Sequence, residues 1–337
     1  MAEQPGIIIS GVGHHLPDTI ETNEELCRNL DVTPEWIVEK TGIERRYIAG
    51  PGDSASSFSI AASKKALAMA GVAADQIDLI IVCTFSGDYI FPPVSAKVQV
   101  ELGATHAQIF DIQANCTGFV TGLTTASDRM RVDPTVRHAL VIGVELNSRY
   151  VDRSNVDTAI FLSDGAGAAV LSRGPAGYGI KASAFHADGS NYEAVRMRGG
   201  GSSHNAIGRA FDASVDHMEM NGIATWKQAI TNVPKAIKRA CEKSGVEVAD
   251  VDFFLFHQAN YNMIDYIVRK MRADMSKTYT NVREVGNTGA ASPAIAMSEA
   301  VEKKLLKHDD LLVLSAVGAG FNFGASVWRW HGIGGGA

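Results

Sequence analysis

Cys116 is the residue of this sequence best suited to act as a nucleophile. It follows a short apolar strand predicted at residues 108–112, and it precedes a helix of small residues predicted from Gly118 to Met130. The unpaired N–H groups and positive dipole end at a helix start favour a thiolate, so this position predicts a lowered pKa and a reactive thiol. Alone, Cys116 could also be a buried free cysteine that packs as a small hydrophobe. That is the role we expect of the other three cysteines, which lie in apolar periodic patterns: Cys27, Cys83 and Cys241.

A histidine and an asparagine in the second half of the chain could polarise a substrate. His257 ends an apolar strand predicted at residues 251–257, and strand ends are where an α/β sheet presents functional groups. Asn287 stands in a Gly-Asn-Thr-Gly segment just before a helix predicted at residues 290–305. Each also has a plain structural reading, as a hydrogen-bonded histidine at a strand edge and as an asparagine that caps a helix. No pair of histidines has metal-ligand spacing, so no metal site is predicted.

A glycine-rich turn near the C-terminus could bind an oxyanion. The segment Gly318-Ala319-Gly320 lies between two apolar strands, and its glycines would let the backbone N–H of Ala319 approach a substrate closely. A tight β-turn without any role in binding would have the same composition.

Two distant segments of the chain repeat one pattern. In residues 66–82, and again in residues 240–256, an amphipathic helix ends at a glycine, an acidic turn follows, and an apolar strand comes next. Farther along, Cys116-Thr117-Gly118 corresponds to Asn287-Thr288-Gly289. The repeat is too long for a solenoid unit and indicates two half-domains related by a pseudo-twofold axis. We therefore expect the helix starts beside Cys116 and Asn287 to face one cavity.

The alternation of helices and strands predicts a layered α/β architecture. Residues 1–175 form the predicted first half-domain, which carries the cysteine. Residues 176–337 form the second, which carries His257 and Asn287, and we expect the two halves to make a single unit. Four local predictions accompany these boundaries: Asn23 caps a helix, residues 164–167 form a turn, residues 172–220 form an irregular connection, and residues 334–337 form a frayed tail.

Composition and charge exclude several classes of partner. The 337 residues carry a net charge of −6 without a basic block, which speaks against nucleic acid or an anionic membrane surface. A hydrophobic content of 46% and a charged content of 20% are ordinary for a soluble enzyme. No apolar run approaches the roughly 18 residues of a membrane span, and the N-terminus does not look like a signal peptide. Four separated cysteines without a CxxC motif predict neither disulfides nor zinc, so we expect a cytoplasmic protein.

Five motifs together strongly resemble one enzyme family, β-ketoacyl-ACP synthase III. They are Cys-Thr-Gly-Phe at Cys116, His-Gln-Ala-Asn at His257, Gly-Asn-Thr at Asn287, Asp-Gly-Ala-Gly-Ala from Asp164, and Gly-Ala-Gly-Phe from Gly318. The resemblance extends over about residues 6–330. It implies the thiolase fold, in which two duplicated half-domains form a layered αβαβα sandwich.

The resemblance also implies a ping-pong reaction on thioester substrates, with no metal or redox cofactor. Cys116 would accept an acyl group from an acyl-CoA, and malonyl-ACP would then decarboxylate and condense with it. His257 and Asn287 would donate hydrogen bonds to the developing enolate. The backbone N–H groups of Cys116 and Ala319 would hold the oxyanion at the acyl carbonyl. An acyl carrier protein and a second copy of the chain are the implied protein partners.

The positions that bind CoA in this family are only partly matched. Trp36, Lys40 and Gly222 occupy positions that the resemblance assigns to CoA binding. Three other polar or basic positions of the family are replaced here, which leaves open whether CoA or ACP carries the first acyl group: Val156, Ile223 and Asn262.

The acyl pocket is expected to involve Phe85, Ser86 and Phe91, with Phe91 reaching across a dimer interface. Arg149 could bind a carboxylate as a bidentate fork, or it could form a structural ion pair. If Ser86 and Arg149 faced the pocket, the acyl group could be dicarboxylic. Glutaryl-CoA would then give a pimeloyl precursor, as in biotin synthesis.

Other activities of the same fold are alternatives. The chain could transfer the acyl group to a hydroxyl or an amine, or serve as a ketosynthase of a polyketide pathway. Asn287 speaks against simple ester formation, because polarising a malonyl thioester is its main use. A 3-hydroxy-3-methylglutaryl-CoA synthase would need a glutamate beside the cysteine, and Asn115-Cys116-Thr117 has none. An intact set of three polar residues also speaks against a non-catalytic subunit.

Overall fold

A nine-stranded sheet runs through the whole molecule in the order β11-β12-β13-β8-β1-β7-β6-β4-β5, in a computed structural model that describes residues 5–333. Strands β1 and β8 meet at a single residue pair, Ile7 with Gly179, so the sheet divides there into two halves. The strands are β1 (Gly6–His15), β4 (Leu79–Cys83), β5 (Gln108–Ile112), β6 (His138–Leu146), β7 (Asp164–Gly174), β8 (Gly179–Ala187), β11 (Phe253–Phe256), β12 (Leu311–Gly318) and β13 (Asn322–Arg329).

The two halves of the sheet have the same topology. Outward from the junction, one half runs β1-β7-β6-β4 and the other runs β8-β13-β12-β11, and β5 extends the first half by one further strand. In each half the first three strands are antiparallel neighbours and the fourth is parallel to the third. The predicted duplication of an α/β half-domain is therefore confirmed. The chain passes from one half to the other between the end of β7 and the start of β8.

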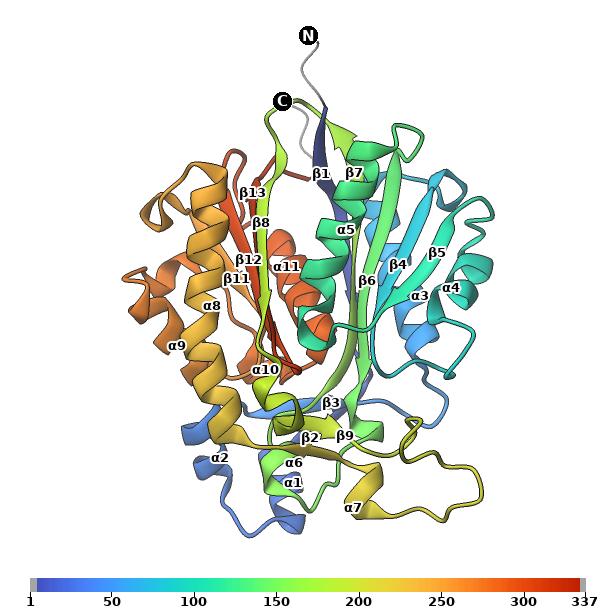
Figure 1. Cartoon of the computed structure of the whole chain (residues 1–337), viewed down its shortest axis with the longest axis vertical. Helices are drawn as coiled ribbons and strands as arrows, with labels where there is room; N and C mark the ends of the chain where they lie inside the picture. The colour runs from blue at the N-terminus through green and yellow to red at the C-terminus, as the bar shows by residue number, and fades with distance from the viewer. Residues whose placement is uncertain (1–4, 334–337) are drawn as a thin grey trace.

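Helices form the remaining three layers (Figure 1). Two central helices lie between the halves of the sheet, and one pair of helices covers each outer face. The result is the predicted αβαβα sandwich. The central helices are α5 (Gly118–Val132) and α11 (Ser292–Glu302), and the outer pairs are α3 (Ala55–Ala70) with α4 (Val94–Leu102) and α8 (Gly222–Ser244) with α9 (Tyr261–Lys270).

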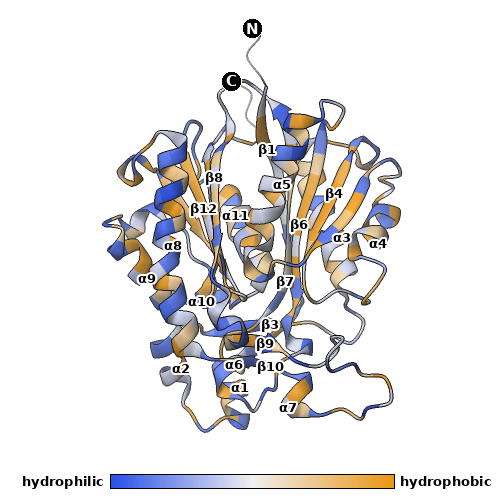
Figure 2. Ribbon diagram, viewed as in Figure 1, coloured by the Kyte–Doolittle hydropathy of each residue, from blue (hydrophilic) through white to orange (hydrophobic). Residues whose placement is uncertain are grey.

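Strand β4 shows how the sequence produces these layers. Its residues alternate between two cores: Leu79 and Ile81 face the central helices, and Ile80 and Val82 face α3 and α4. A strand buried on both faces reads as a continuous apolar run, as this one does. In Figure 2 the hydrophobic colour follows the strands, whereas α8 alternates hydrophilic and hydrophobic segments, as a helix with one buried face does.

Both repeated helices end at the predicted glycine. Gly71 after α3 and Gly245 after α8 have φ angles of 64° and 69°, which side-chain-bearing residues rarely adopt. Each glycine N–H bonds to a carbonyl of its helix, and the chain then turns into β4 or β11. The repeated sequence pattern therefore corresponds to one repeated structural unit.

Short elements gather beneath the layers in Figure 1, at the end of the sheet where the site lies. Strands β2 and β3 pair with each other, and so do β9 and β10. These elements are β2 (Thr19–Thr22), α1 (Asn23–Leu26), α2 (Pro34–Thr41), β3 (Arg45–Ile48), α6 (Val156–Ala159), β9 (Val195–Met197), α7 (Ala213–Asp216), β10 (Met218–Met220) and α10 (Val282–Val285). In the part of the chain that the structure describes, no helix is long and apolar enough to cross a bilayer.

Three local predictions are wrong. Thr22, not Asn23, caps the first helix, in a capping box with Glu25, while the Asn23 side chain is buried and donates to a backbone carbonyl. Residues 164–167 begin strand β7 rather than forming a turn, since their small side chains fit beside α11. The stretch 172–220 contains the core strand β8, whose pattern is masked by polar residues at its exposed positions. The predicted tail at 334–337 lies outside the described residues.

Candidate active site

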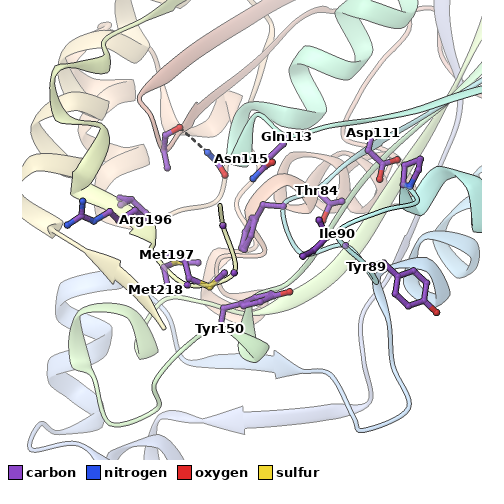
Figure 3. Close-up of a pocket in the computed structure, with 18 of the residues that line it drawn as sticks. Thr84, Tyr89, Ile90, Asp111, Gln113, Asn115, Tyr150, Arg196, Met197 and Met218 are labelled. Carbon is purple, nitrogen blue, oxygen red and sulfur yellow. Dashed lines mark hydrogen bonds between the residues drawn. The ribbon is translucent and has the colours of Figure 1, made fainter. Parts of the chain in front are cut away.

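Cys116 lies in a strained turn between β5 and α5. The preceding Asn115 has a φ angle of +49°, which is uncommon for any residue except glycine. Its side-chain Nδ2 donates to the carbonyl of Ala319 at 3.1 Å, the dashed contact in Figure 3. This bond ties the turn of Cys116 to the turn between β12 and β13. The backbone conformation at Asn115 thus places the cysteine at the start of α5.

Gly318 allows the second turn to approach this closely. A Cβ atom at Gly318 would lie 2.8 Å from the carbonyl oxygen of Ala114 and 3.0 Å from the backbone nitrogen of Thr117. Any larger residue would therefore push the turn away from Cys116. The glycine brings Ala319 beside the nucleophile, as a role for its N–H in an oxyanion hole requires.

His257 follows β11 and is fixed by a buried serine. Its Nδ1 lies 2.6 Å from the Ser292 Oγ, and this oxygen accepts a hydrogen bond from the backbone N–H of Gln258 at 3.0 Å, so the serine proton is free to be donated to Nδ1. Because Nδ1 is engaged, Nε2 is the ring nitrogen available to a ligand. Burial lowers the pKa of His257 to about 4, so the ring is neutral near pH 7.

Asn287 is held through its backbone and its side chain. Its N–H donates to the carbonyl of Phe161 and its carbonyl accepts from the N–H of Ser163, both at 2.9 Å. Its side-chain Oδ1 accepts from the N–H of Gly289 at 2.9 Å. The amide is thereby oriented, and within residues 5–333 its Nδ2 has no hydrogen-bond acceptor. Asn287 therefore does not cap α11; it presents a free donor.

The three predicted polar groups line a single cavity of about 150 Å³. The cysteine comes from the first half-domain and the other two from the second, as the duplication predicts. Cys116 and His257 are the only titratable side chains among the described residues that line the cavity. Apolar side chains from both halves form most of its wall: Phe85, Phe161, Leu162, Val195, Met218, Met220, Trp226, Met263, Val317 and Phe321.

The cavity changes the expected ionisation of the nucleophile. Burial, with the nearby Glu145 as a smaller cause, raises the pKa of the Cys116 thiol to about 12. The predicted lowering of this pKa is therefore wrong for the resting cavity, in which desolvation outweighs the favourable helix start. Cys116 rests as a thiol, and its proton must leave as a substrate is attacked.

Sequence patterns did not reveal three buried polar residues around the site. Glu145 accepts from the Ser86 hydroxyl at 2.6 Å and from the Phe85 N–H at 3.2 Å, and burial raises the pKa of its carboxyl to about 8. Asn147 and Ser292 are also fully buried. The only signal was the presence of a glutamate and an asparagine at the end of an otherwise apolar strand.

The structure places the residues predicted for the acyl pocket in different environments. Phe85 lines both the cavity and an adjoining outer pocket of about 800 Å³ (Figure 3). Phe91 lines only the outer pocket and is 82% exposed, next to the 90% exposed Ile90. Ser86 lines neither space, because Glu145 and the N–H of Leu146 hold its hydroxyl.

Arg149 also lies outside the cavity in this chain. Its side chain is exposed, and its guanidinium donates to the carbonyl of Gly50. The alternative ion pair is not formed, since a backbone carbonyl is the partner, and the guanidinium lies outside the cavity where the carboxylate fork was predicted. The condition set for a dicarboxylic acyl group, that Ser86 and Arg149 face the pocket, is not met.

The predicted CoA-binding residues are likewise divided. Gly222 lines the cavity at the start of α8, whereas Trp36 and Lys40 lie on α2, outside it. The side chain of Asn262 donates to the carbonyls of Glu39 and Lys40. The replacement of a basic residue by Asn262 therefore has a structural consequence: it joins α2 to α9.

We predict that His257 remains neutral well below pH 6.5, because its folded-state pKa is lowered. Its ring resonances in an NMR titration should stay constant from about pH 8 to about pH 5 and move only as the pH approaches 4. The spectrum of His257→Ala identifies the signal. A midpoint near the ordinary value of 6.5 would show that the ring is not buried as described.

A cysteine, a neutral histidine and an oriented amide donor in one cavity, on a duplicated αβαβα sandwich, define a condensing enzyme of the thiolase fold. Two sequence profiles agree with this class. The profile of 3-oxoacyl-[acyl-carrier-protein (ACP)] synthase III matches residues 110–189, and the profile of its C-terminal part matches residues 241–330.

Full-length relatives give the family. A β-ketoacyl-[acyl-carrier-protein] synthase III of Rhodospirillum centenum is 38% identical over 96% of this chain and 98% of its own length. The crystal structure of 3-oxoacyl-[acyl-carrier-protein] synthase III from Aquifex aeolicus superposes with a TM-score of 0.89 at 31% identity, covering 96% of this chain and all of that one. A priming β-ketosynthase of a polyketide pathway superposes with a TM-score of 0.90 at 30% identity, covering 98% of both chains. The chain belongs to the β-ketoacyl-ACP synthase III family of acyltransferases.

Proposed function

We propose that this enzyme transfers an acyl group from an acyl-CoA to Cys116 and condenses it with malonyl-ACP to give a β-ketoacyl-ACP. The observation that carries the proposal is the meeting of Cys116, His257 and Asn287 in one apolar cavity. Two of these groups are fixed so that an unengaged nitrogen remains for a substrate.

In the first half-reaction, the sulfur of Cys116 attacks the thioester carbonyl. A new carbon–sulfur bond forms, the bond to CoA breaks, and the proton of the Cys116 thiol ends on the departing CoA thiol. The oxyanion formed on the way is held by the N–H groups of Cys116 and Ala319. Support for this role comes from the Asn115 bond to Ala319 and the close approach at Gly318.

In the second half-reaction, the malonyl thioester loses CO₂ and leaves an enolate. His257 and Asn287 donate hydrogen bonds to its oxygen, each worth about 3 kcal/mol in comparable acyl-transfer chemistry. The enolate carbon then attacks the acyl carbonyl on Cys116, a carbon–carbon bond forms, and the sulfur leaves and is reprotonated. A neutral His257 serves this step with its proton on Nε2, while Nδ1 accepts from the Ser292 hydroxyl, whose oxygen lies 2.6 Å away.

The partners follow from the same proposal. Thioesters of CoA and ACP are the substrates, and no metal or redox cofactor takes part. The exposed apolar segment at Tyr89, Ile90 and Phe91 supports a homodimer, because a second copy would cover it. We place the enzyme in the cytoplasm, where both thioesters are available.

The cavity favours an uncharged acyl group. Its described wall contains no lysine or arginine to neutralise a carboxylate, and burial of an unpaired carboxylate is costly. We therefore prefer an uncharged acyl group to a glutaryl group as the group transferred to Cys116. Because three CoA-contact positions of the family are replaced, acyl loading from CoA and from ACP thioesters must be compared to identify the carrier of the first acyl group.

Intact-protein mass spectrometry tests the proposal. After incubation with acetyl-, octanoyl- or glutaryl-CoA, we expect one acyl adduct from an uncharged donor, with glutaryl loading at least about tenfold slower because its carboxylate finds no cation. Arg149→Ala should leave these rates unchanged, since this residue lies outside the cavity. Faster glutaryl loading that depends on Arg149 would contradict the preference, and no adduct from any donor would contradict the function.

A further inference from the structure

One face of strand β6 forms the seat of the segment that carries Asn287. Residues two apart on a strand point the same way, so Gly143 and Glu145 share the face toward residues 287–291, and Asn147 follows directly after the strand ends at Leu146. A Cβ atom at Gly143 would lie 2.4 Å from the carbonyl of Ala290, so the segment rests on bare backbone there.

Glu145 and Asn147 approach the segment through their side chains. A Cβ atom at Gly289 would lie 2.7 Å from the Glu145 Cγ and 3.6 Å from the Asn147 Nδ2. Gly289 has a φ angle of +57° and thus combines a left-handed backbone with a surface that admits no side chain. Gly143, Glu145 and Asn147 therefore fix how closely residues 287–291 approach β6.

Asn147 adds a specific pair of hydrogen bonds. Its Nδ2 donates to the carbonyl of Ser163 at 2.8 Å and to the carbonyl of Asn287 at 3.3 Å, and the residue is 1% exposed. These carbonyls lie on opposite sides of the single parallel bridge that joins Leu162 to Asn287. One side-chain amide therefore fastens both strands of the bridge that positions Asn287.

We propose that Asn147 is a positioning residue for the second half-reaction, holding Asn287 so that its Nδ2 meets the enolate oxygen. This inference rests on the proposed function of Asn287. Asn147 also lines the cavity, but its hydrogen bonds go to the bridge and not to the turn that carries the nucleophile, so its loss should affect acyl transfer to Cys116 far less than condensation. Displacement of a polarising group by a fraction of an ångström is enough to slow a reaction strongly.

Two substitutions separate positioning from packing. Asn147→Leu keeps the volume and removes the donors, whereas Asn147→Asp keeps the shape and places an acceptor against two carbonyls. We expect single-turnover condensation of the preloaded enzyme with malonyl-ACP to fall about tenfold in Asn147→Leu and further in Asn147→Asp, as is typical for supporting groups. Acyl loading and the KM for malonyl-ACP should remain within about twofold.

Gln99 provides the matched control. Gln99 lies on α4, away from the cavity, and its side-chain amide donates to the carbonyl of Ala107 at 2.8 Å. Gln99→Leu and Gln99→Glu should leave both half-reactions unchanged. If Asn147→Leu does not fold, the isosteric Asn147→Asp gives the comparison alone.

Each result has a definite meaning. Wild-type condensation by Asn147→Asp, or equal losses of loading and condensation in the variants, would overturn the positioning role. Greater activity in Asn147→Asp than in Asn147→Leu would assign Asn147 to packing and overturn it as well. A preloaded wild-type enzyme that does not condense with malonyl-ACP would instead overturn the proposed function itself.

Discussion

Cys116→Ser should lose acyl loading by at least about a thousandfold. A serine hydroxyl is far harder to ionise than a thiol, and this cavity already raises the pKa of the thiol to about 12. The only other titratable side chain in the described wall is His257, whose lowered pKa makes it a weak base. The cavity therefore offers no group strong enough to activate a hydroxyl. Intact mass after incubation with an acyl-CoA measures the loss.

Cys241→Ala is the control for this substitution. Cys241 is a buried free cysteine on α8 that packs in the core between this helix and the sheet. Its removal should cost some stability and leave acyl loading intact. An acyl adduct of normal yield on Cys116→Ser, or its loss in Cys241→Ala alone, would show that Cys116 is not the acceptor.

Regular structure was predicted well where its causes are local. The helix predicted from Gly118 to Met130 spans Gly118–Val132, and the two repeated helices end at Gly71 and Gly245 as predicted. Periodic apolar residues and a closing glycine are contained in the segment itself, so they can be read without the rest of the fold. The duplication was visible for the same reason, because each copy carries its own helix, glycine and strand.

The symmetry of the sequence predicted that the three polar residues lie together. It did not predict which residues surround them. Equivalence of Cys116 and Asn287 in two halves predicts one shared cavity. The ionisation of the cysteine, however, depends on how deeply both halves bury it and on Glu145, a residue distant in sequence. The local sequence reveals the helix start, which lowers the pKa of a cysteine. It does not reveal how deeply the cysteine is buried, which raises that pKa.

Side-chain direction was the least predictable property. Ser86 lies within two residues of Thr84 and Phe85, which line the outer pocket, yet its hydroxyl turns to Glu145. Arg149 turns to a backbone carbonyl of another segment. The partners that set these two side-chain directions lie about 60 and 100 residues away in sequence, so no local periodicity predicts them. Asn147 and Ser292 gave no signal for a similar reason, since their partners Asn287 and His257 lie 140 and 35 residues away in sequence.

Asn287→Ala should separate the two half-reactions. Its free Nδ2 is offered to the enolate, and loss of one such donor costs about 3 kcal/mol, or roughly a hundredfold to a thousandfold in rate. Acyl loading does not use this donor and should remain within a fewfold of wild type. Single-turnover condensation of the preloaded enzyme with malonyl-ACP measures the first effect and intact mass the second. His257→Ala should show the same division.

Asn281→Ala supplies the comparison, because it removes another buried asparagine from the same stretch of chain. The Asn281 side chain donates to Glu299 and does not line the cavity, so its loss should affect both half-reactions alike, through stability alone. A donor to the enolate affects condensation and not acyl loading, so a general loss of activity is not expected. If Asn287→Ala condenses malonyl units at the wild-type rate, the hydrogen bond to the enolate comes from another group. If its acyl loading falls as far as its condensation, the residue supports the cavity and does not polarise the malonyl thioester.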